Sequence, residues 1–106
     1  MIRFTDKAIA AIKHMLLEKN QQDHGIRIGA RGEGRCAMNF YIGIQRAPLP
    51  DDKVFQWRGI TVMMDQLSVG RMLNIELDFI EMPHGSGFVF RNRSEFNSKD
   101  KSSIAE

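Results

Sequence analysis

The chain has a single cysteine, Cys36, among its 106 residues. One thiol cannot form an internal disulfide, and it cannot supply a multi-cysteine metal site within one chain. The sequence also lacks any apolar run near the ~20 residues that a membrane helix needs. Its start reaches Asp6 without the apolar stretch of a signal peptide. These absences predict a protein with no membrane segment that stays in the cytoplasm.

An excess of one charge is missing as well. Fifteen basic and thirteen acidic residues are spread along the chain and give a net charge of +2. Such a balance does not predict nucleic-acid binding, because the positive field is only local. The hydrophobic share of 42% and charged share of 26% are typical of a soluble globular protein. The length is that of one domain, with enough residues to bury a core.

Motifs for catalysis are not visible either. No nucleophile–base pair and no pair of carboxylates lies at a spacing that supports chemistry, so the protein is not expected to be an enzyme. Gly32-x-Gly34-x-x-Ala37 fits the dinucleotide fingerprint, but that site requires a helix to begin directly after the glycines. Residues 38–44 instead alternate with period two, as a strand does. The glycines therefore indicate a tight loop.

Periodicity predicts two helices. From residue 5 to about residue 19 the apolar residues fall at helical spacing, with Thr5 as the N-cap and Asp6 at the positive end of the helix dipole. Residues 65–74 are predicted to form a short second helix that Asp65 caps. Its apolar positions are Leu67, Met72 and Leu73.

Alternating apolar residues predict about six short strands, at residues 26–31, 38–44, 54–57, 60–64, 75–80 and 85–90. Arg58-Gly59 is predicted to turn a hairpin between two of them. Because short turns join the strands, antiparallel pairing should dominate. The fold class is therefore α+β: a mostly-β domain over residues 1–92 with an N-terminal helix and a second short helix. The polar tail at residues 93–106 is expected to be disordered.

Three stretches, in this order, carry a resemblance to a known family. They are the opening Phe4-Thr5-Asp6 with its amphipathic helix, the glycine-rich loop Arg31-Gly-Glu-Gly-Arg-Cys36 before an apolar strand, and Gly85-Ser-Gly-Phe-Val-Phe-x-Asn92. Over residues 1–92 the chain resembles the HesB/IscA-like family of A-type iron–sulfur carriers. The resemblance implies the carrier fold, a role in iron–sulfur cluster assembly, and Cys36 at the position of the family's first cysteine.

The chain departs from that family at its tail. Where the family has a Cys-Gly-Cys motif, residues 97–101 read Asn-Ser-Lys-Asp-Lys. A [2Fe–2S] cluster needs four ligands, and a homodimer of this chain supplies two thiolates. Glutathione, His, Asp or a partner's cysteine would have to complete the set. The expected function is thus a degenerate carrier or accessory scaffold that acts through Cys36 on iron or an iron–sulfur cluster. Its expected partners are proteins of iron–sulfur assembly or apo-acceptors.

An alternative remains open: a protein-interaction module of the HesB-like fold that binds no metal. Cys36 itself has two interpretations. It is either a metal-binding thiolate whose pKa Arg31 and Arg35 lower, or a semi-buried remnant of an ancestral site. His84 is a second candidate metal ligand, if the two glycine loops meet in space.

Other residues are given structural roles. Gly85 and Gly87 are expected at positive φ, in a sharp turn into a strand. Arg27 is expected to lie, like Arg31 and Arg35, on a solvated strand face. The methionines are expected to fill gaps in the core or in an interface: Met38, Met63, Met64, Met72 and Met82.

Overall fold

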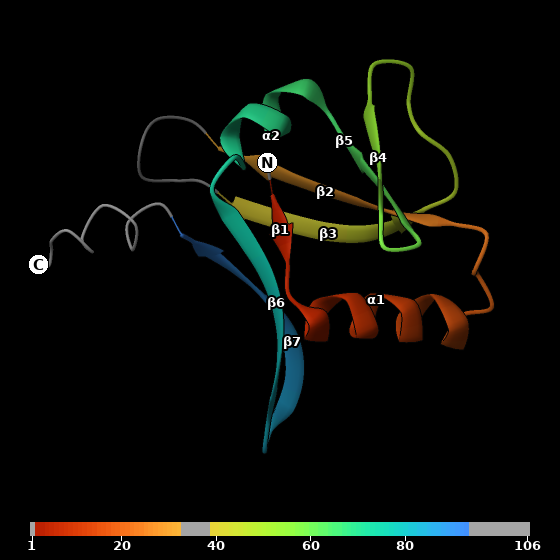
Figure 1. Ribbon diagram of the computed structural model, residues 1–106, viewed down its shortest axis with the longest axis vertical. Helices are drawn as coiled ribbons and strands as arrows, with labels where there is room; N and C mark the ends of the chain where they lie inside the picture. The colour runs from red at the N-terminus through yellow and green to blue at the C-terminus, as the bar shows by residue number, and fades with distance from the viewer. Residues whose placement is uncertain (1, 33–38, 94–106) are drawn as a thin grey trace, which may run out of the picture.

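The computed structural model describes residues 2–32 and 39–93. These residues form a four-stranded sheet in the order β3-β2-β5-β4, a three-stranded sheet in the order β1-β6-β7, and two helices (Figure 1). The predicted α+β fold is confirmed. The elements are β1 (Arg3–Phe4), α1 (Asp6–Glu18), β2 (Gly25–Arg31), β3 (Asn39–Gln45), β4 (Lys53–Trp57), β5 (Ile60–Met64), α2 (Gln66–Arg71), β6 (Ile75–Met82) and β7 (Gly85–Asn92).

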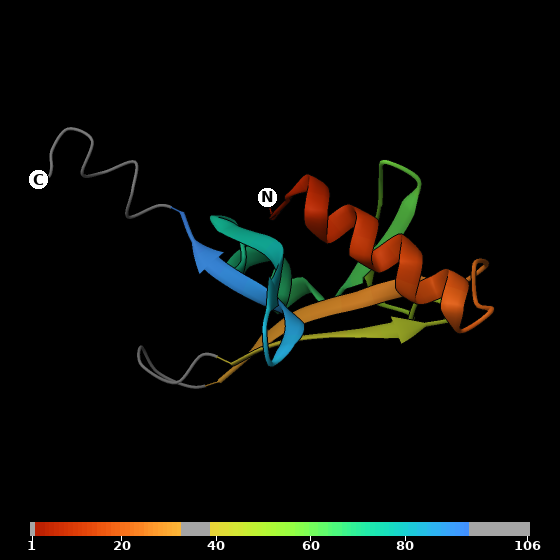
Figure 2. The same cartoon turned by 90° about the horizontal axis from the view of Figure 1, so that it is seen from below.

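Helix α1 begins and ends where its sequence provides caps. The Thr5 side chain accepts a hydrogen bond from the Ala8 amide at 3.1 Å, as predicted for the N-cap. At the other end Asn20 has a φ of 56°, and the amides of Asn20 and Gln21 donate back to Leu17 and Leu16. This is the Schellman pattern that satisfies the last carbonyl groups. Between the caps, α1 lies on one face of the four-stranded sheet (Figure 2).

The four-stranded sheet contains the predicted hairpin. Arg58 and Gly59 have φ values of 51° and 89°, the pair of positive angles that a two-residue type I′ turn requires. Trp57 pairs with Ile60 across this turn. On the other side of β5, strand β2 runs parallel to it, and β3 pairs antiparallel with the outer side of β2.

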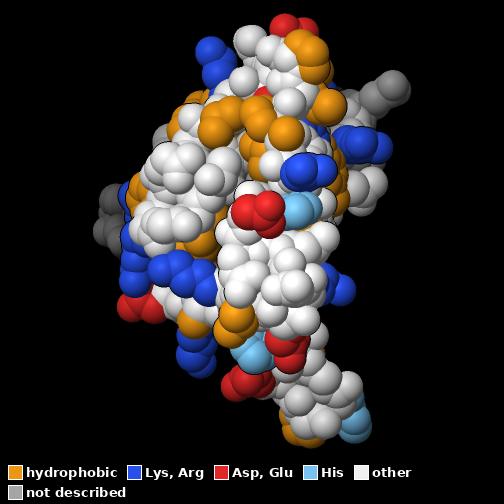
Figure 3. Space-filling model, turned by 90° about the vertical axis from the view of Figure 1, so that its right-hand side faces the viewer, with side chains coloured by type: hydrophobic (Ala, Val, Ile, Leu, Met, Phe, Trp, Pro, Cys, Tyr) orange, Lys and Arg blue, Asp and Glu red, His pale blue; other side chains and the backbone are white. Residues whose placement is uncertain are grey.

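The three-stranded sheet is joined to the start of α1. Strand β1 runs parallel to β6, and β6 and β7 form a hairpin whose tip projects from the body of the molecule (Figure 3). The Thr5 hydroxyl, which caps α1, also donates to Asp78 on β6 at 2.6 Å. One side chain therefore fixes the helix end to the sheet.

A single apolar cluster lies between α1 and the two sheets. Its members are almost fully buried and come from α1, from the residue that follows α2, and from four strands or their flanks. Burial of each large aliphatic side chain stabilises the fold by about 1.5–3 kcal/mol. The cluster includes Ala8, Ile9, Ile12, Leu16, Ile26, Ile28, Ala30, Ile60, Val62, Met64, Met72, Ile75 and Leu77.

Two features of the pairing differ from the prediction. Strand β1 was not expected, because two residues are too few to show an alternating pattern. The β1–β6 and β2–β5 pairs are parallel, although antiparallel pairs are in the majority. Parallel pairing joins strands that are far apart in the sequence, so local turn signals do not reveal it.

Three side-chain or backbone expectations were wrong. Gly87 is paired with Ile80 inside the β6–β7 ladder and does not have a positive φ, whereas Gly85 does, at 143°. Leu67 and Leu73 are more than half exposed, and of the predicted apolar positions around α2 only Met72 is buried. Met82 is 58% exposed near the hairpin tip, while Met63, Met64 and Met72 are in the interior as expected.

Several expectations fall outside the described residues. They concern Gly34, Arg35, Cys36 and Met38 in the loop, and the tail from residue 94 onward. Residues 39–45 form strand β3 and not a helix, so the helix start that a dinucleotide site requires is not formed there. Within residues 2–32 and 39–93, no helix is long and apolar enough to cross a membrane.

Candidate functional site at the strand ends

The loop that carries Cys36 joins β2 to β3, and the strand ends around it come together. Strand β2 ends, β3 begins and β7 ends on the same side of the molecule, at the left in Figure 1. The rings of Phe40 and Phe90 stack there with centroids 5.1 Å apart. Gly32 leaves β2 with a φ of 142°, a value that favours glycine. We call Arg31, Gly32, Asn39, Phe40 and Phe90 the strand-end surface.

Two arginines lie at this surface. The Arg31 guanidinium carbon is 4.9 Å from the centre of the Tyr41 ring, within the range of a cation–π contact. Arg71, near the end of α2, donates to the Ala30 carbonyl at 3.1 Å. Arg31 was expected near the loop, but Arg71 was not. Both place positive charge beside the point where the chain leaves β2.

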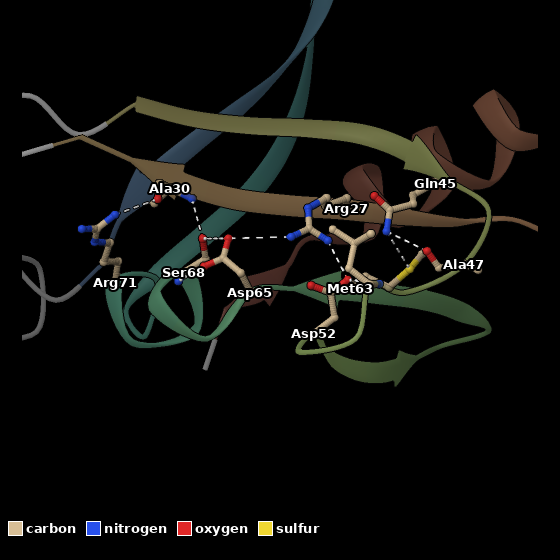
Figure 4. A network of polar contacts seen from close by, with 10 residues as sticks. Arg27, Ala30, Gln45, Ala47, Asp52, Met63, Asp65, Ser68 and Arg71 are labelled. Atoms are coloured by element: carbon tan, nitrogen blue, oxygen red, sulfur yellow. Dashed lines mark hydrogen bonds and ion pairs between the residues drawn. The ribbon is translucent and has the colours of Figure 1, made fainter.

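The outer face of the four-stranded sheet carries a polar network (Figure 4). Arg27 donates to the Asp52 carboxylate at 2.6 Å and lies 3.8 Å from that of Asp65. The side chain of Asp52 is only 2% exposed. The hydrogen bond from Arg27 lowers the pKa of Asp52 below its ordinary value, and the Leu49 amide acts in the same direction, against the effect of burial. The loop between β3 and β4 is thereby fixed to the sheet.

This network corrects the prediction for Arg27. Its side chain is 17% exposed and paired with carboxylates, so it is not part of a solvated face. The alternating pattern did identify the sheet face correctly, because Arg27 does point away from the apolar cluster. What the pattern could not show is that Asp52 and Asp65 return to the same place from elsewhere in the chain.

Helix α2 completes the network by covering the edge of β2 beyond the end of β5. The Ala30 amide donates to the hydroxyl of Ser68 at 3.0 Å, and Ser68 is fully buried. The Ser68 hydroxyl in turn donates to Asp65, which also caps α2 by accepting from the Ser68 amide. Side chains thus satisfy backbone groups that a neighbouring strand would otherwise pair with.

The two predicted metal ligands have different positions relative to this site. Cys36 belongs to the loop outside the described residues. His84 lies at the exposed turn between β6 and β7. Five residues of β7 lie between it and Phe90 at the strand-end surface, a span of about 20 Å at the rise of an extended chain. Within residues 2–32 and 39–93, no three His, Asp or Glu side chains gather as a metal site.

Comparison with known proteins adds the decisive observation. The family model for iron-sulphur cluster biosynthesis matches residues 1–98. The chain belongs to the iron–sulphur cluster biosynthesis family. It is 33% identical over 92 residues to an uncharacterized protein of Bradyrhizobium diazoefficiens, with 87% of each chain covered. It is 30% identical over 105 residues to the iron-binding protein IscA of Cronobacter sakazakii, covering 99% of this chain and 94% of that one.

The fold of this family member is also that of a solved relative. The crystal structure of IscA with the [2Fe-2S] cluster matches with a TM-score of 0.73 and 20% sequence identity, over 87% of this chain and 85% of that chain. The predicted HesB/IscA-like membership and fold are therefore confirmed, and with them the assignment to iron–sulfur cluster assembly. The comparisons do not test the roles of Cys36 and His84.

Proposed function

We propose that this family member handles iron or an iron–sulfur cluster, as cargo, at a site that two chains share through Cys36. The observation that carries the proposal is the cysteine count. The chain has one cysteine, while a cluster takes four ligands, usually thiolates. Two copies supply two thiolates, and glutathione or a partner's cysteines complete the set. The named relatives, an iron-binding protein and an IscA that holds a [2Fe-2S] cluster, support the choice of cargo.

The geometry of the described residues supports the same site. Three strand ends meet beside the loop of Cys36, and Arg31 and Arg71 place positive charge there. Positive charge near a thiol favours its thiolate, the form that binds metal. We propose that the homodimer acts in the cytoplasm as a carrier or scaffold without enzymatic activity, together with assembly proteins or apo-acceptors.

Anaerobic reconstitution with iron and sulfide, with and without glutathione, tests this function. We expect visible absorbance only when glutathione or another thiol completes the ligand set, at no more than one cluster for two chains. Iron and sulfide per chain give the stoichiometry. One cluster on every chain, or cluster binding that is the same with and without the added thiol, would contradict the shared site. Should the variant Cys36→Ser bind as the parent does, His84 becomes the next ligand to test.

The second candidate function is a protein-interaction module that binds no metal. The observation in its favour is the pair Lys99 and Lys101, which stand where the family has thiolates. Absence of bound iron in every reconstitution condition would establish this candidate and exclude the first.

A further inference from the structure

In the part of the chain that the structure describes, the outer edge of the four-stranded sheet pairs with no further strand. Strand β3 is the last strand of its sheet (Figure 2). Its seven residues, Asn-Phe-Tyr-Ile-Gly-Ile-Gln, contain no charged side chain and no proline. Proteins normally protect such an edge with lysine, proline, a bulge or a covering element. The edge of β2 has such a cover in α2, whereas β3 has none among the described residues.

The hydrogen bonds show which backbone groups of β3 point outward. The amide and the carbonyl of Ala30 are both bonded on the α2 side of β2, to Ser68 and Arg71. Ala30 is therefore not hydrogen-bonded to its partner on β3, Phe40. Because this pattern alternates along an antiparallel pair, the backbone groups of Phe40, Ile42 and Ile44 are directed away from β2. Three amides and three carbonyls at a two-residue spacing form a template for one more strand.

A hollow lies beside one end of this edge. It has a volume of about 600 Å³, and its lining includes Gly43 and Ile44 on β3 together with Lys19, His24 and Arg46. Lys19 directly follows α1, and Arg46 directly follows β3, so the hollow lies at the end of β3 that is remote from the Cys36 loop. Asp23, which is bonded to His24 at 2.8 Å, offsets part of the charge. Lys19 and Arg46 leave the hollow positive.

We propose that the edge of β3 binds an extended segment of a partner protein as an added strand, with an acidic side chain of that segment in the hollow. Backbone hydrogen bonds to Phe40, Ile42 and Ile44 supply affinity, as in other cases of strand addition. Lys19 and Arg46 supply preference for acidic residues at one end.

A second copy of the chain fits this edge less well than a partner segment does. This argument rests on the proposed function. Symmetric antiparallel pairing about Ile42 would place Asn39 opposite Gln45 of the second copy. The two Asn39 residues would then be about 20 Å apart along the strands, and the two loops that carry Cys36 would leave at opposite ends. Such a pairing does not bring the two β2–β3 connections together, as the proposed shared site requires.

Fluorescence anisotropy with the iron-free, full-length chain tests the proposal. The probe is a labelled ten-residue peptide of alternating Thr and Val that ends in two Glu residues. We expect saturable binding, weakened at least tenfold when the two Glu are Lys, and weakened similarly by the double variant Lys19→Glu/Arg46→Glu. Binding that is equal for the two peptides would contradict the role of the hollow.

N-methylated peptides test strand pairing without altering the protein. The backbone amides of an added strand fall into two alternating sets, and only one set faces β3. N-methylation of the set that faces β3 should abolish binding, and N-methylation of the other set should change the affinity less than twofold. The variant Ile42→Pro removes one outward amide and should also abolish binding. Equal effects of methylating the two sets, or no binding of the unmodified peptide, would overturn the proposal. A dimer in sedimentation that Ile42→Pro dissociates would assign the edge to a second copy. Since no iron is present, these outcomes do not depend on the cluster.

Discussion

The outer face of the four-stranded sheet and the strand-end surface make opposite use of polar groups. On the outer face, the side chains of Arg27, Asp52, Asp65 and Ser68 form hydrogen bonds and ion pairs with one another and with backbone amides of the chain. At the strand-end surface, the proposed site has one thiol per chain and would take its other ligands from outside the chain. The comparison indicates that folding and cargo binding are separable in this protein: changes at the first region should cost stability, and changes at the second should cost only binding.

The largest expected effect on stability is at Asp52. The variant Asp52→Ala leaves the largely buried Arg27 without its closest carboxylate and should lower the free energy of unfolding by about 3 kcal/mol. Urea denaturation measures the change. The matched control is Arg58→Gln, which breaks the exposed ion pair to Asp6 and should cost less than about 1 kcal/mol. Equal losses for the two variants would show that the network is no stronger than a surface pair.

Two glycines provide a second contrast. A Cβ at Gly29 would collide with the Tyr41 hydroxyl oxygen and ring, so the ring would have to move from its place above β2. Gly29→Ala should therefore destabilise the protein by about 1–3 kcal/mol. Gly87→Val should be neutral or stabilising, because Gly87 has open space and ordinary strand geometry. Thermal unfolding of both variants checks this. A large loss at Gly87 would restore the positive-φ interpretation.

Acid should weaken the junction between α1 and β6. The hydrogen bond from Thr5, with the ion pair to Arg91 and the Phe79 amide, lowers the pKa of Asp78 from 3.8 to about 2. A carboxyl group whose pKa is lower in the folded state stabilises the fold above its unfolded pKa. That contribution is present above about pH 4 and is lost as the pH falls toward 2. Urea midpoints between pH 5 and pH 2 should fall less steeply in Asp78→Asn than in the parent. If the urea midpoints of the two proteins fall equally with pH, Asp78 does not contribute to the loss of stability in acid.

The tail should have the smallest effect. Deletion of residues 97–106 removes a stretch without an apolar stripe, so the thermal midpoint should stay within about 4 °C of the parent. A fall of more than about 10 °C would mean that the tail contributes to folding. Calorimetry of the truncated and full chains decides between these outcomes.

These regions also differ in how far the sequence could predict them. The Thr5 cap, the Arg58-Gly59 turn and the strands with clear alternation were predicted because local residues determine them. The Arg27 network and the parallel β2–β5 pair were not, because Asp52 and Asp65 reach Arg27 only through tertiary folding. The prediction for Gly87 was wrong because the sequence does not distinguish a glycine that is needed at a positive φ from one that lies in an ordinary strand. At the candidate site, the role that the motif suggests for Cys36 stays a prediction, and nothing local indicated Arg71.

One paired measurement tests the separation of folding from cargo binding most directly: the thermal midpoint and the bound iron of Cys36→Ser beside those of the parent. Reconstitution with glutathione should load the parent with iron at no more than one cluster per two chains, and the variant with none. Without iron, the two midpoints should agree within about 4 °C. A variant that retains the iron of the parent, or that loses its fold before any metal is added, would contradict the account.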